Sequence, residues 1–292
     1  MLRPSQALQR AAVTGAHLPR VAALAELHEK GIDFRSSQLC MITGRPKAGK
    51  SFFAQWLASE WAKAAREQGD ECPGVYFFLD GTPFTAAVRQ AAWVTGDTTA
   101  SIAEALEGPG VAYYEDALAT VADDIAFVFD KRPELPAIQA EIDAYVELWD
   151  RYPSWMVFDN LLNIEGCFED HRVQKDVLAE LQSLAYTTGA CIVVLHHASE
   201  SGVKDYSKAP RIGDTDGKVN QLPEMVLPIA KDPDSDAFRI SVGAVRDGAA
   251  SDPNGDRPVV LTADLSRVMF TRRGSVAPWA PRSNGWSDDD DD

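Results

Sequence analysis

The sequence predicts an α/β fold in which helices cover both faces of a mostly parallel central sheet. Short apolar runs typical of buried strands alternate with segments of helical periodicity through residues 38–195. A glycine-rich loop stands between the first of these strands and the first long helix. Acidic residues or histidines directly follow three other apolar runs. Because the carboxyl ends of parallel strands meet at one edge of a sheet, these side chains are expected to gather there.

Each predicted element follows from the hydrophobic period and the turn residues that bound it. Apolar runs predict strands at residues 38–43, 74–79, 155–158 and 190–195, and shorter strands at 225–229, 238–245 and 259–261. Helical spacing of apolar residues predicts helices at residues 52–65, 85–93, 141–149 and 173–187. Residues 96–109 are predicted to form a looser connection, and residues 113–130 carry a mixed pattern.

Composition and charge limit the class of protein. The chain has 292 residues, of which 45% are hydrophobic and 25% charged, as expected for a globular protein with one large domain. Acidic residues outnumber basic ones by 44 to 28, and five of them form the run 288–292. The resulting net charge of −16 argues against coating of nucleic acid by bulk charge. Any contact with nucleic acid must therefore come from a local group of basic residues.

The cysteines and the apolar runs indicate a cytoplasmic protein. Cys40, Cys72, Cys167 and Cys191 are too widely spaced for a structural zinc site or a small disulfide framework. No apolar run approaches the roughly 18 to 20 residues that a membrane span needs, and the N-terminus lacks a signal peptide. We expect a location in the cytoplasm, the host cytoplasm if the source is a virus, and no membrane partner.

Three regions are predicted along the chain. Residues 1–37 form an N-terminal helical extension that packs either on the core or on a neighbouring subunit. Four apolar residues recur in it at helical spacing: Leu18, Val21, Leu24 and Leu27. Residues 38–273 form the α/β domain, and residues 274–292 form a flexible acidic tail rich in Pro, Ser, Gly and Asp.

The glycine-rich loop matches the pattern GxxxxGK[ST], with a strand before it and a helix after it. Its members are Gly44, Arg45, Pro46, Lys47, Ala48, Gly49, Lys50 and Ser51. In such a loop the backbone N–H groups surround the phosphates of a nucleotide, the lysine reaches the outer phosphates, and the Ser51 hydroxyl binds Mg²⁺. The sequence therefore predicts a P-loop that takes a nucleotide with magnesium.

Two acidic residues are candidates to act beside this loop. Asp159 ends the run 155–158 and is predicted to hold Mg²⁺, the alternative being an ordinary turn residue. Asp80 follows the run 74–79, which we expect to lie beside the strand that precedes the P-loop. Asp80 is predicted to orient or deprotonate the attacking water, and a turn or helix-capping role is the alternative.

Two neighbouring histidines follow the run 190–195. An imidazole at this edge of the sheet can sense the terminal phosphate through a hydrogen bond. His196 is our candidate for this relay, and a structural hydrogen bond is the equally weighted alternative. Two adjacent histidines alone do not predict a zinc site.

Taken in order, these segments resemble the RecA-type P-loop ATPases, and among them the hexameric replicative DNA helicases of the DnaB type and the related plasmid replication helicases. The resemblance covers residues 40–270. The matching segments are 44–51 for Walker A, 77–80 for the catalytic acid, 155–159 for Walker B, 195–197 for the paired histidines of the plasmid type, 243–248 for the arginine finger and 266–270 for the closing strand. The resemblance implies ATP and Mg²⁺ as ligands and a ring-forming, phage-like motor that moves along single-stranded DNA in replication.

The resemblance also implies roles for residues outside the P-loop. Arg246 corresponds to the arginine finger, which reaches the phosphate bound by the next subunit. The segments 163–172 and 198–220 correspond to loops that face the central channel and hold single-stranded DNA. The second loop supplies four candidate DNA contacts: Lys204, Lys208, Arg211 and Lys218. A solvated surface loop is the alternative, because acidic residues are interspersed.

Three departures from the family pattern leave other functions open. Asp80 is one methylene shorter than the expected glutamate, and Ala244 stands where DnaB-type sequences carry a lysine. Only about forty residues precede the P-loop, so a primase or collar domain is expected on another chain. A RecA-like recombinase or annealing ATPase is one alternative function, and a nucleotide-gated loader or regulator with weak hydrolysis is another.

The end of the chain combines Trp286 with the five aspartates of residues 288–292. It resembles the acidic tails of phage helicases and single-strand binding proteins. Such a tail is expected to recruit a basic partner: a polymerase, a primase or a single-strand binding protein. A solubilising end is the alternative.

Overall fold

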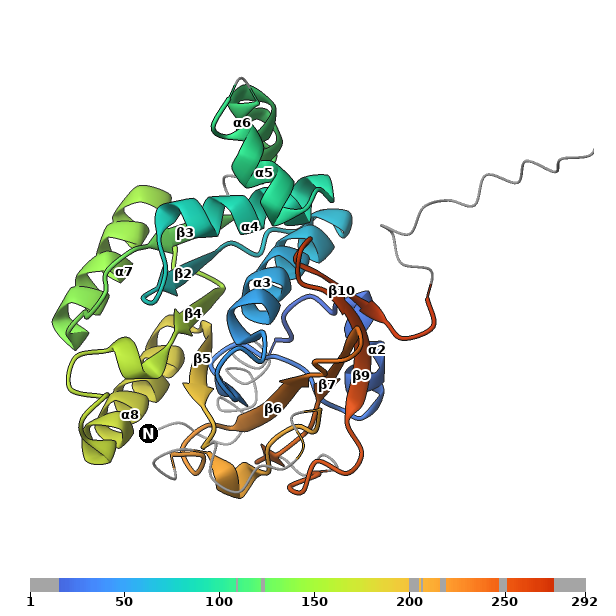
Figure 1. The fold of residues 1–292 in the computed structure, drawn as a ribbon. Helices are drawn as coiled ribbons and strands as arrows, with labels where there is room; N and C mark the ends of the chain where they lie inside the picture. Colours follow the sequence, from blue (N-terminus) through green and yellow to red (C-terminus); the bar gives the residue numbers. More distant parts are fainter. Residues whose placement is uncertain are drawn as a thin grey trace, which may run out of the picture.

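The computed structural model describes residues 16–108, 110–121, 124–199, 205, 207–215, 219–246 and 251–275. In this part of the chain, ten strands form one sheet in the order β10-β9-β7-β6-β1-β5-β4-β2-β3, with β8 paired to β6 (Figure 1). The strands are β1 (Leu39–Gly44), β2 (Gly74–Phe78), β3 (Ile125–Val128), β4 (Trp155–Asp159), β5 (Cys191–His197), β6 (Met225–Lys231), β7 (Ala237–Ile240), β8 (Ala244–Val245), β9 (Val259–Asp264) and β10 (Met269–Arg272).

The strand directions confirm the predicted fold class. The neighbouring strands from β6 to β3 pair in parallel, and β7 to β10 extend the sheet beyond β6 with antiparallel pairs. The result is a mixed, mostly parallel sheet flanked by helices.

Helices cover both faces of this sheet. Figure 1 shows α3 and α4 on one side and α7 and α8 on the other, with α5 and α6 projecting beyond the edge of the sheet. The α-helices are α2 (Ala25–Glu29), α3 (Lys50–Glu67), α4 (Pro83–Thr95), α5 (Thr99–Ala105), α6 (Val111–Ala119), α7 (Leu135–Trp149) and α8 (His171–Thr188), and short 3₁₀ turns form η1 (Ala22–Leu24), η2 (Leu161–Asn163) and η3 (Ile212–Asp214). Within the described ranges, none of the helices is long and apolar enough to cross a membrane.

Two stretches differ from the elements that the sequence predicts. Within the predicted loose connection of residues 96–109, residues 99–105 form the helix α5. It begins after Thr98, whose side chain accepts a hydrogen bond from the Ser101 N–H and caps the helix. The single strand predicted for residues 238–245 divides into β7 and β8. One extra residue is inserted opposite Pro228, which has no N–H for the ladder, and the strand bulges there.

The position of β2 also differs from the expectation. The predicted contact between residues 74–79 and the P-loop strand is wrong, because β5 and β6 flank β1 and β2 lies beyond β4. Asp80 therefore approaches the P-loop from a strand that pairs with β4. The backbone N–H of Leu79 donates to the carbonyl oxygen of Asp159 at 2.9 Å, which fixes this approach.

Side chains alternate between two buried clusters along each central strand, as the pleat requires. On β4, Trp155 and Val157 belong to the cluster that contains the apolar face of α3, whereas Met156 and Phe158 belong to the cluster that contains residues of α8. Tyr76 of β2 packs on the α3 face in the same way. The alternation decides which side of the sheet receives each polar residue at the strand ends.

The N-terminal segment packs on the core rather than standing apart from it. Its four apolar residues are buried in the cluster of the α3 face: Leu18, Val21, Leu24 and Leu27. The buried Asp33 carboxylate accepts hydrogen bonds from Arg20 and lies 2.7 Å from the His28 Nδ1 atom. Apolar burial and this polar cluster together hold residues 16–37 against α3.

The packing predicts that Leu27→Ala destabilises the whole domain. The Leu27 side chain is 1% exposed, and truncating a fully buried leucine costs about 2–5 kcal/mol in the free energy of unfolding. Leu148→Ala on α7 is the matched control, because Leu148 is 79% exposed and its truncation should change stability by less than about 0.5 kcal/mol. Urea unfolding measures both, and equal effects would contradict the packing.

Candidate functional site

The P-loop connects the carboxyl end of β1 to the amino end of α3. Gly49 precedes the helix with φ of 86°, a left-handed conformation that glycine adopts without strain. Its carbonyl oxygen accepts the N–H of Phe53, so the helix begins at once after the loop. The free N–H groups of the first turn of α3 and the positive end of its dipole therefore face the loop, as anion binding requires.

The Lys50 ammonium is buried within this loop. Its Nζ atom donates to the carbonyl oxygens of Gly44 at 2.9 Å and Arg45 at 3.0 Å. Burial lowers the pKa of Lys50 to about 8, and the charges of Asp159 and Asp80 oppose this shift. Burial removes the water that would stabilise the ammonium charge, and the hydrogen bonds of Lys50 go to neutral carbonyls. Negatively charged phosphate oxygens would stabilise this charge, so the position fits an anionic ligand.

Asp159 lies at the end of β4 on the α3 face of the sheet. Its buried carboxylate accepts hydrogen bonds from the Ser51 hydroxyl and, at 3.0 Å, from the Tyr76 hydroxyl. Burial raises the pKa of Asp159, and the hydrogen bonds from Ser51 and Tyr76 oppose the rise, as does the charge of Lys50. A hydroxyl and a carboxylate side by side are oxygen donors that Mg²⁺ accepts.

The protein alone does not supply a complete metal centre here. Among the described residues, no group of three or more His, Cys, Asp or Glu side chains gathers as a metal site. The pair Ser51 and Asp159 instead fits the partial coordination typical of Mg²⁺ bound together with a nucleotide, where phosphate and water oxygens complete the shell.

Asp80 completes the acidic side of the site. It lies in the turn after β2, two residues beyond Phe78, and its side chain is exposed. Its charge acts on Lys50 across the intervening strands. The structure thus brings Asp80, Asp159 and Lys50 to one edge and one face of the sheet.

The two histidines at the end of β5 point to opposite faces. His197 lies opposite Gly44 in the strand register, and its Nδ1 atom is 3.3 Å from the Lys50 Nζ atom. His196 is fully buried opposite Thr43, and the alternation of β5 places it on the α8 face. The structure therefore brings His197, rather than the predicted His196, to the P-loop.

Arg89 on α4 is a residue of this site that the sequence reasoning missed. Its guanidinium lies over the Phe52 ring, 4.1 Å from the ring centre, and its charge acts on Asp159. Burial lowers the pKa of Arg89, while Tyr76 and Asp159 raise it. Its buried Nη1 atom has no hydrogen-bond partner among the described residues. No motif marks Arg89. The one sequence signal for it is its place in α4, the helix that follows Asp80 in the chain.

The Arg45 side chain contacts the second predicted DNA loop. Its Nη1 atom donates to the carbonyl oxygens of Lys208 at 3.0 Å and Asp205 at 3.3 Å. The end of β5 meets the same loop, since the Ser199 N–H donates to the carbonyl oxygen of Asp214 at 2.7 Å. Of the four predicted DNA contacts, Lys208 and Arg211 are exposed on this loop, and Lys204 and Lys218 lie outside the described residues.

Arg246 lies far from the P-loop of its own chain. It follows β8, which pairs with the first residues of β6, and these lie beside the amino end of β1. Its Nη2 atom donates to the carbonyl oxygen of Leu222 at 3.1 Å, and its Nη1 atom is 3.6 Å from the Glu224 carboxylate. The structure does not bring Arg246 together with Lys50 or Asp80.

Comparison with known sequences gives a family and two phage relatives. The AAA domain family matches residues 13–203, more than half of the chain. The Gene 65 protein of Mycobacterium phage L5 is 29% identical over 268 residues, covering 87% of this chain and 92% of that protein. The Gene 65 protein of Mycobacterium phage D29 is 27% identical over 227 residues, covering 75% of this chain and 92% of that protein.

Comparison with solved structures identifies the fold. A solved ATPase domain matches with a TM-score of 0.71 and 14% identity, over 92% of this chain and 95% of that one. A DnaB-like replicative helicase, solved in a study of its interactions with primase, matches with a TM-score of 0.74 and 13% identity, over 93% of this chain and 68% of that one. The fold is therefore the RecA-like P-loop fold of these ATPase domains.

The burial of Lys50 predicts that affinity for ATP falls as pH rises. Below about pH 8 the ammonium is charged, and above it the neutral amine loses its attraction for phosphate. One pH unit above this pKa, binding should be weaker by up to ~10-fold. Calorimetric titration of ATP with Mg²⁺ between pH 7 and pH 9 measures the trend. Lys50→Arg should bind with a flatter pH dependence, because a guanidinium stays charged; equal slopes would contradict the assignment.

Proposed function

Because the chain belongs to the AAA domain family of P-loop ATPases, we propose that it hydrolyses ATP with Mg²⁺ and works as a ring-forming helicase motor on single-stranded DNA in replication. The observation that carries this proposal is the convergence of Lys50, Ser51, Asp159 and Asp80 at the P-loop edge of the sheet. The fold shared with DnaB-like helicase domains supports the finer assignment.

In the proposed mechanism, the residues of the P-loop bind and orient the phosphates. The backbone N–H groups of residues 44–51 and the Lys50 ammonium hold the phosphate oxygens, and Ser51 and Asp159 hold the magnesium. When bound, Mg²⁺ neutralises charge that develops on the phosphate oxygens. Asp80 accepts a hydrogen bond from the attacking water and orients it toward the terminal phosphate. Its short side chain leaves this water less firmly held than a glutamate would, so we expect slow turnover.

The nucleotide site and the DNA loop are proposed to communicate through two contacts. Arg45 joins the P-loop to the backbone at Asp205 and Lys208. His197 lies beside Lys50 at the end of β5, and Ser199, two residues later, donates to Asp214 of the same loop. We assign the phosphate-sensing role to His197 for this reason. A shift in the P-loop on hydrolysis would move the loop through both links.

The proposed DNA contacts are the four basic residues of this loop: Lys204, Lys208, Arg211 and Lys218. A short basic loop can follow the DNA backbone without reading its sequence. Such a local contact also agrees with the acidic composition of the chain as a whole.

Arg246 is proposed to act only on the neighbouring subunit's nucleotide. Its place beside the amino end of β1, the end of that strand away from the P-loop, argues against a role in its own site. To reach a neighbour it would have to leave Leu222 and Glu224, to which it is bound in this structure. A ring would thus complete each site with a charge from the next subunit.

ATPase rate with and without single-stranded DNA tests the proposal. We expect DNA to stimulate the wild-type rate and Lys50→Ala to lower turnover by ~10²-fold or more. Neutralising Lys204, Lys208, Arg211 and Lys218 together should weaken DNA binding by ~10-fold or more, because four phosphate contacts are lost. The matched control neutralises three lysines and one arginine elsewhere: Lys30, Lys131, Lys175 and Arg132.

The outcomes separate the proposed function from its alternatives. A nucleotide-dependent ring in electron micrographs, together with unwinding of a forked duplex, supports the helicase. Open filaments that pair homologous strands without unwinding would indicate a recombinase. A near-zero ATPase rate that DNA does not change would indicate a nucleotide-gated loader.

A further inference from the structure

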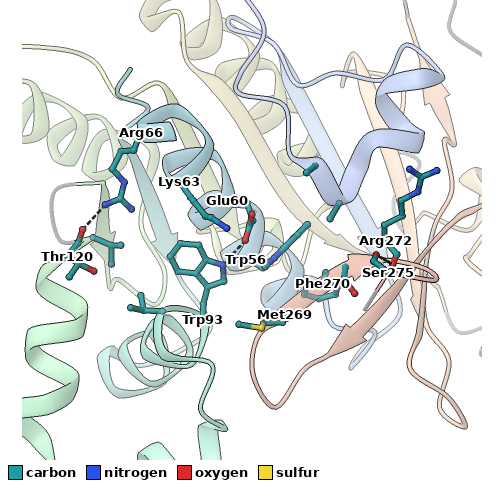
Figure 2. A pocket seen from close by; sticks show the side chains of 15 residues that line it. Trp56, Glu60, Lys63, Arg66, Trp93, Thr120, Met269, Phe270, Arg272 and Ser275 are labelled. Atoms are coloured by element: carbon teal, nitrogen blue, oxygen red, sulfur yellow. Dashed lines mark hydrogen bonds between the residues drawn. The ribbon is translucent and has the colours of Figure 1, made fainter. Parts of the chain in front are cut away.

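A groove beside the C-terminal strand β10 lies away from the nucleotide site. It has a volume of about 790 Å³ and runs along α3, α4 and β10. Figure 2 shows its aromatic and methionine side chains between Arg66 and Thr120 at one end and Arg272 and Ser275 at the other. Trp56 and Phe270 form the buried floor, with ring centres 5.1 Å apart, and Trp93 and Met269 are partly exposed above it. This floor suits an apolar or aromatic segment.

The rim of the groove is positively charged, although the chain has a net charge of −16. Lys63 and Arg66 lie on α3, and Arg272 lies on β10 at the opposite end. Arg66 pairs with Asp124 at 3.1 Å, and no described acidic side chain pairs with Lys63 or Arg272. Glu60, the acidic residue of the lining, accepts a hydrogen bond from the Trp93 indole at 2.9 Å. The groove therefore suits a ligand that carries carboxylates.

The chain itself supplies a segment with this chemistry. Ser275, the last described residue, lines the groove, and its N–H donates to the carbonyl oxygen of Arg272. The seventeen residues that follow include the sequence Pro-Trp-Ala-Pro at 278–281, Trp286 and five consecutive aspartates. Proline-rich sequences with an aromatic residue are suited to aromatic grooves, because little conformational freedom is lost on docking.

We propose that residues 276–292 dock in the groove of their own chain. Trp279 lies four residues after Ser275, so it reaches the aromatic floor. The acidic run lies thirteen to seventeen residues after Ser275, and an extended chain covers up to about 3.3–3.6 Å per residue. The aspartates can therefore reach Lys63 and Arg66 at the far end. Because the tail is attached at the rim, its effective concentration at the groove is higher than that of a separate partner in solution.

Docking would control which surfaces are open to other proteins. While the tail occupies the groove, its carboxylates face Lys63 and Arg66 and are withheld from a basic partner. A partner that binds the aspartates would then also uncover the apolar floor. The aspartates of the tail and the apolar floor of the groove are thus proposed to become accessible at the same time.

Disulfide trapping in the full-length chain tests this docking. Ser287→Cys places a thiol beside the acidic run, and Thr120→Cys places one at the far end of the groove. The four native cysteines are buried, so the introduced thiols react selectively. Thr187→Cys on α8 is the matched control. Thr187 is also exposed and also donates its hydroxyl to a helix carbonyl, but it lies on a helix of the opposite face.

The expected result is an intrachain disulfide that forms ~10-fold or more faster with Thr120→Cys than with Thr187→Cys. Lys63→Glu should slow disulfide formation with Thr120→Cys, because the aspartates would then face a carboxylate, whereas the matched reversal Lys175→Glu on α8 should leave the rate unchanged. Equal rates for the two cysteine pairs would overturn the proposal. A disulfide that links only separate copies of the chain would overturn docking in the groove of the same chain.

Discussion

The buried ammonium of Lys50 is the interaction on which the rest of the nucleotide site depends. A charge removed from water needs partners, and the two backbone carbonyls of Gly44 and Arg45 supply only part of the stabilisation. The charges of Asp159, at the end of β4, and of Asp80, in the turn after β2, add to this stabilisation. The loop conformation and the acids at the strand ends together hold this one charge at the carboxyl end of β1.

The pleat of the sheet explains how distant residues meet at Lys50. Positions that alternate along β4 and β5 place Asp159 and His197 on the α3 face, and the same alternation places His196 on the opposite face. The N-terminal segment and the aromatic cluster around Trp56 then hold α3 against that face. The core packing thus positions the amino end of α3, where the P-loop ends.

Sequence patterns predicted much of the fold and named candidate residues for the site. The P-loop motif and the ends of the apolar strands gave Lys50, Ser51, Asp159 and Asp80 as candidates from local spacing, and the structure brings these four residues together. Pattern alone did not reveal that β5 lies between β1 and β4, since strand order depends on how the helices cross between strands. Which of the two histidines lies beside Lys50 depends on which face of the sheet α3 covers, and the sequence pattern does not show this. Contacts between distant segments were also beyond the reach of local patterns. The hydrogen bonds from Arg45 to the backbone of Asp205 and Lys208 span sequence separations of 160 and 163 residues, and no local signal marks them.

We expect the P-loop and the loop that contains Asp205, Lys208 and Asp214 to move as one coupled unit, because Arg45 and the end of β5 join them. Hydrogen exchange of the full-length chain, with and without a nonhydrolysable ATP analogue and Mg²⁺, tests it most directly. The amides of Ile212, Asp214 and Thr215 are hydrogen-bonded, so their exchange reports on the loop. Binding of the nucleotide is expected to change their exchange rates by ~5-fold or more. A change confined to residues 44–51, with none in residues 207–215, would contradict it.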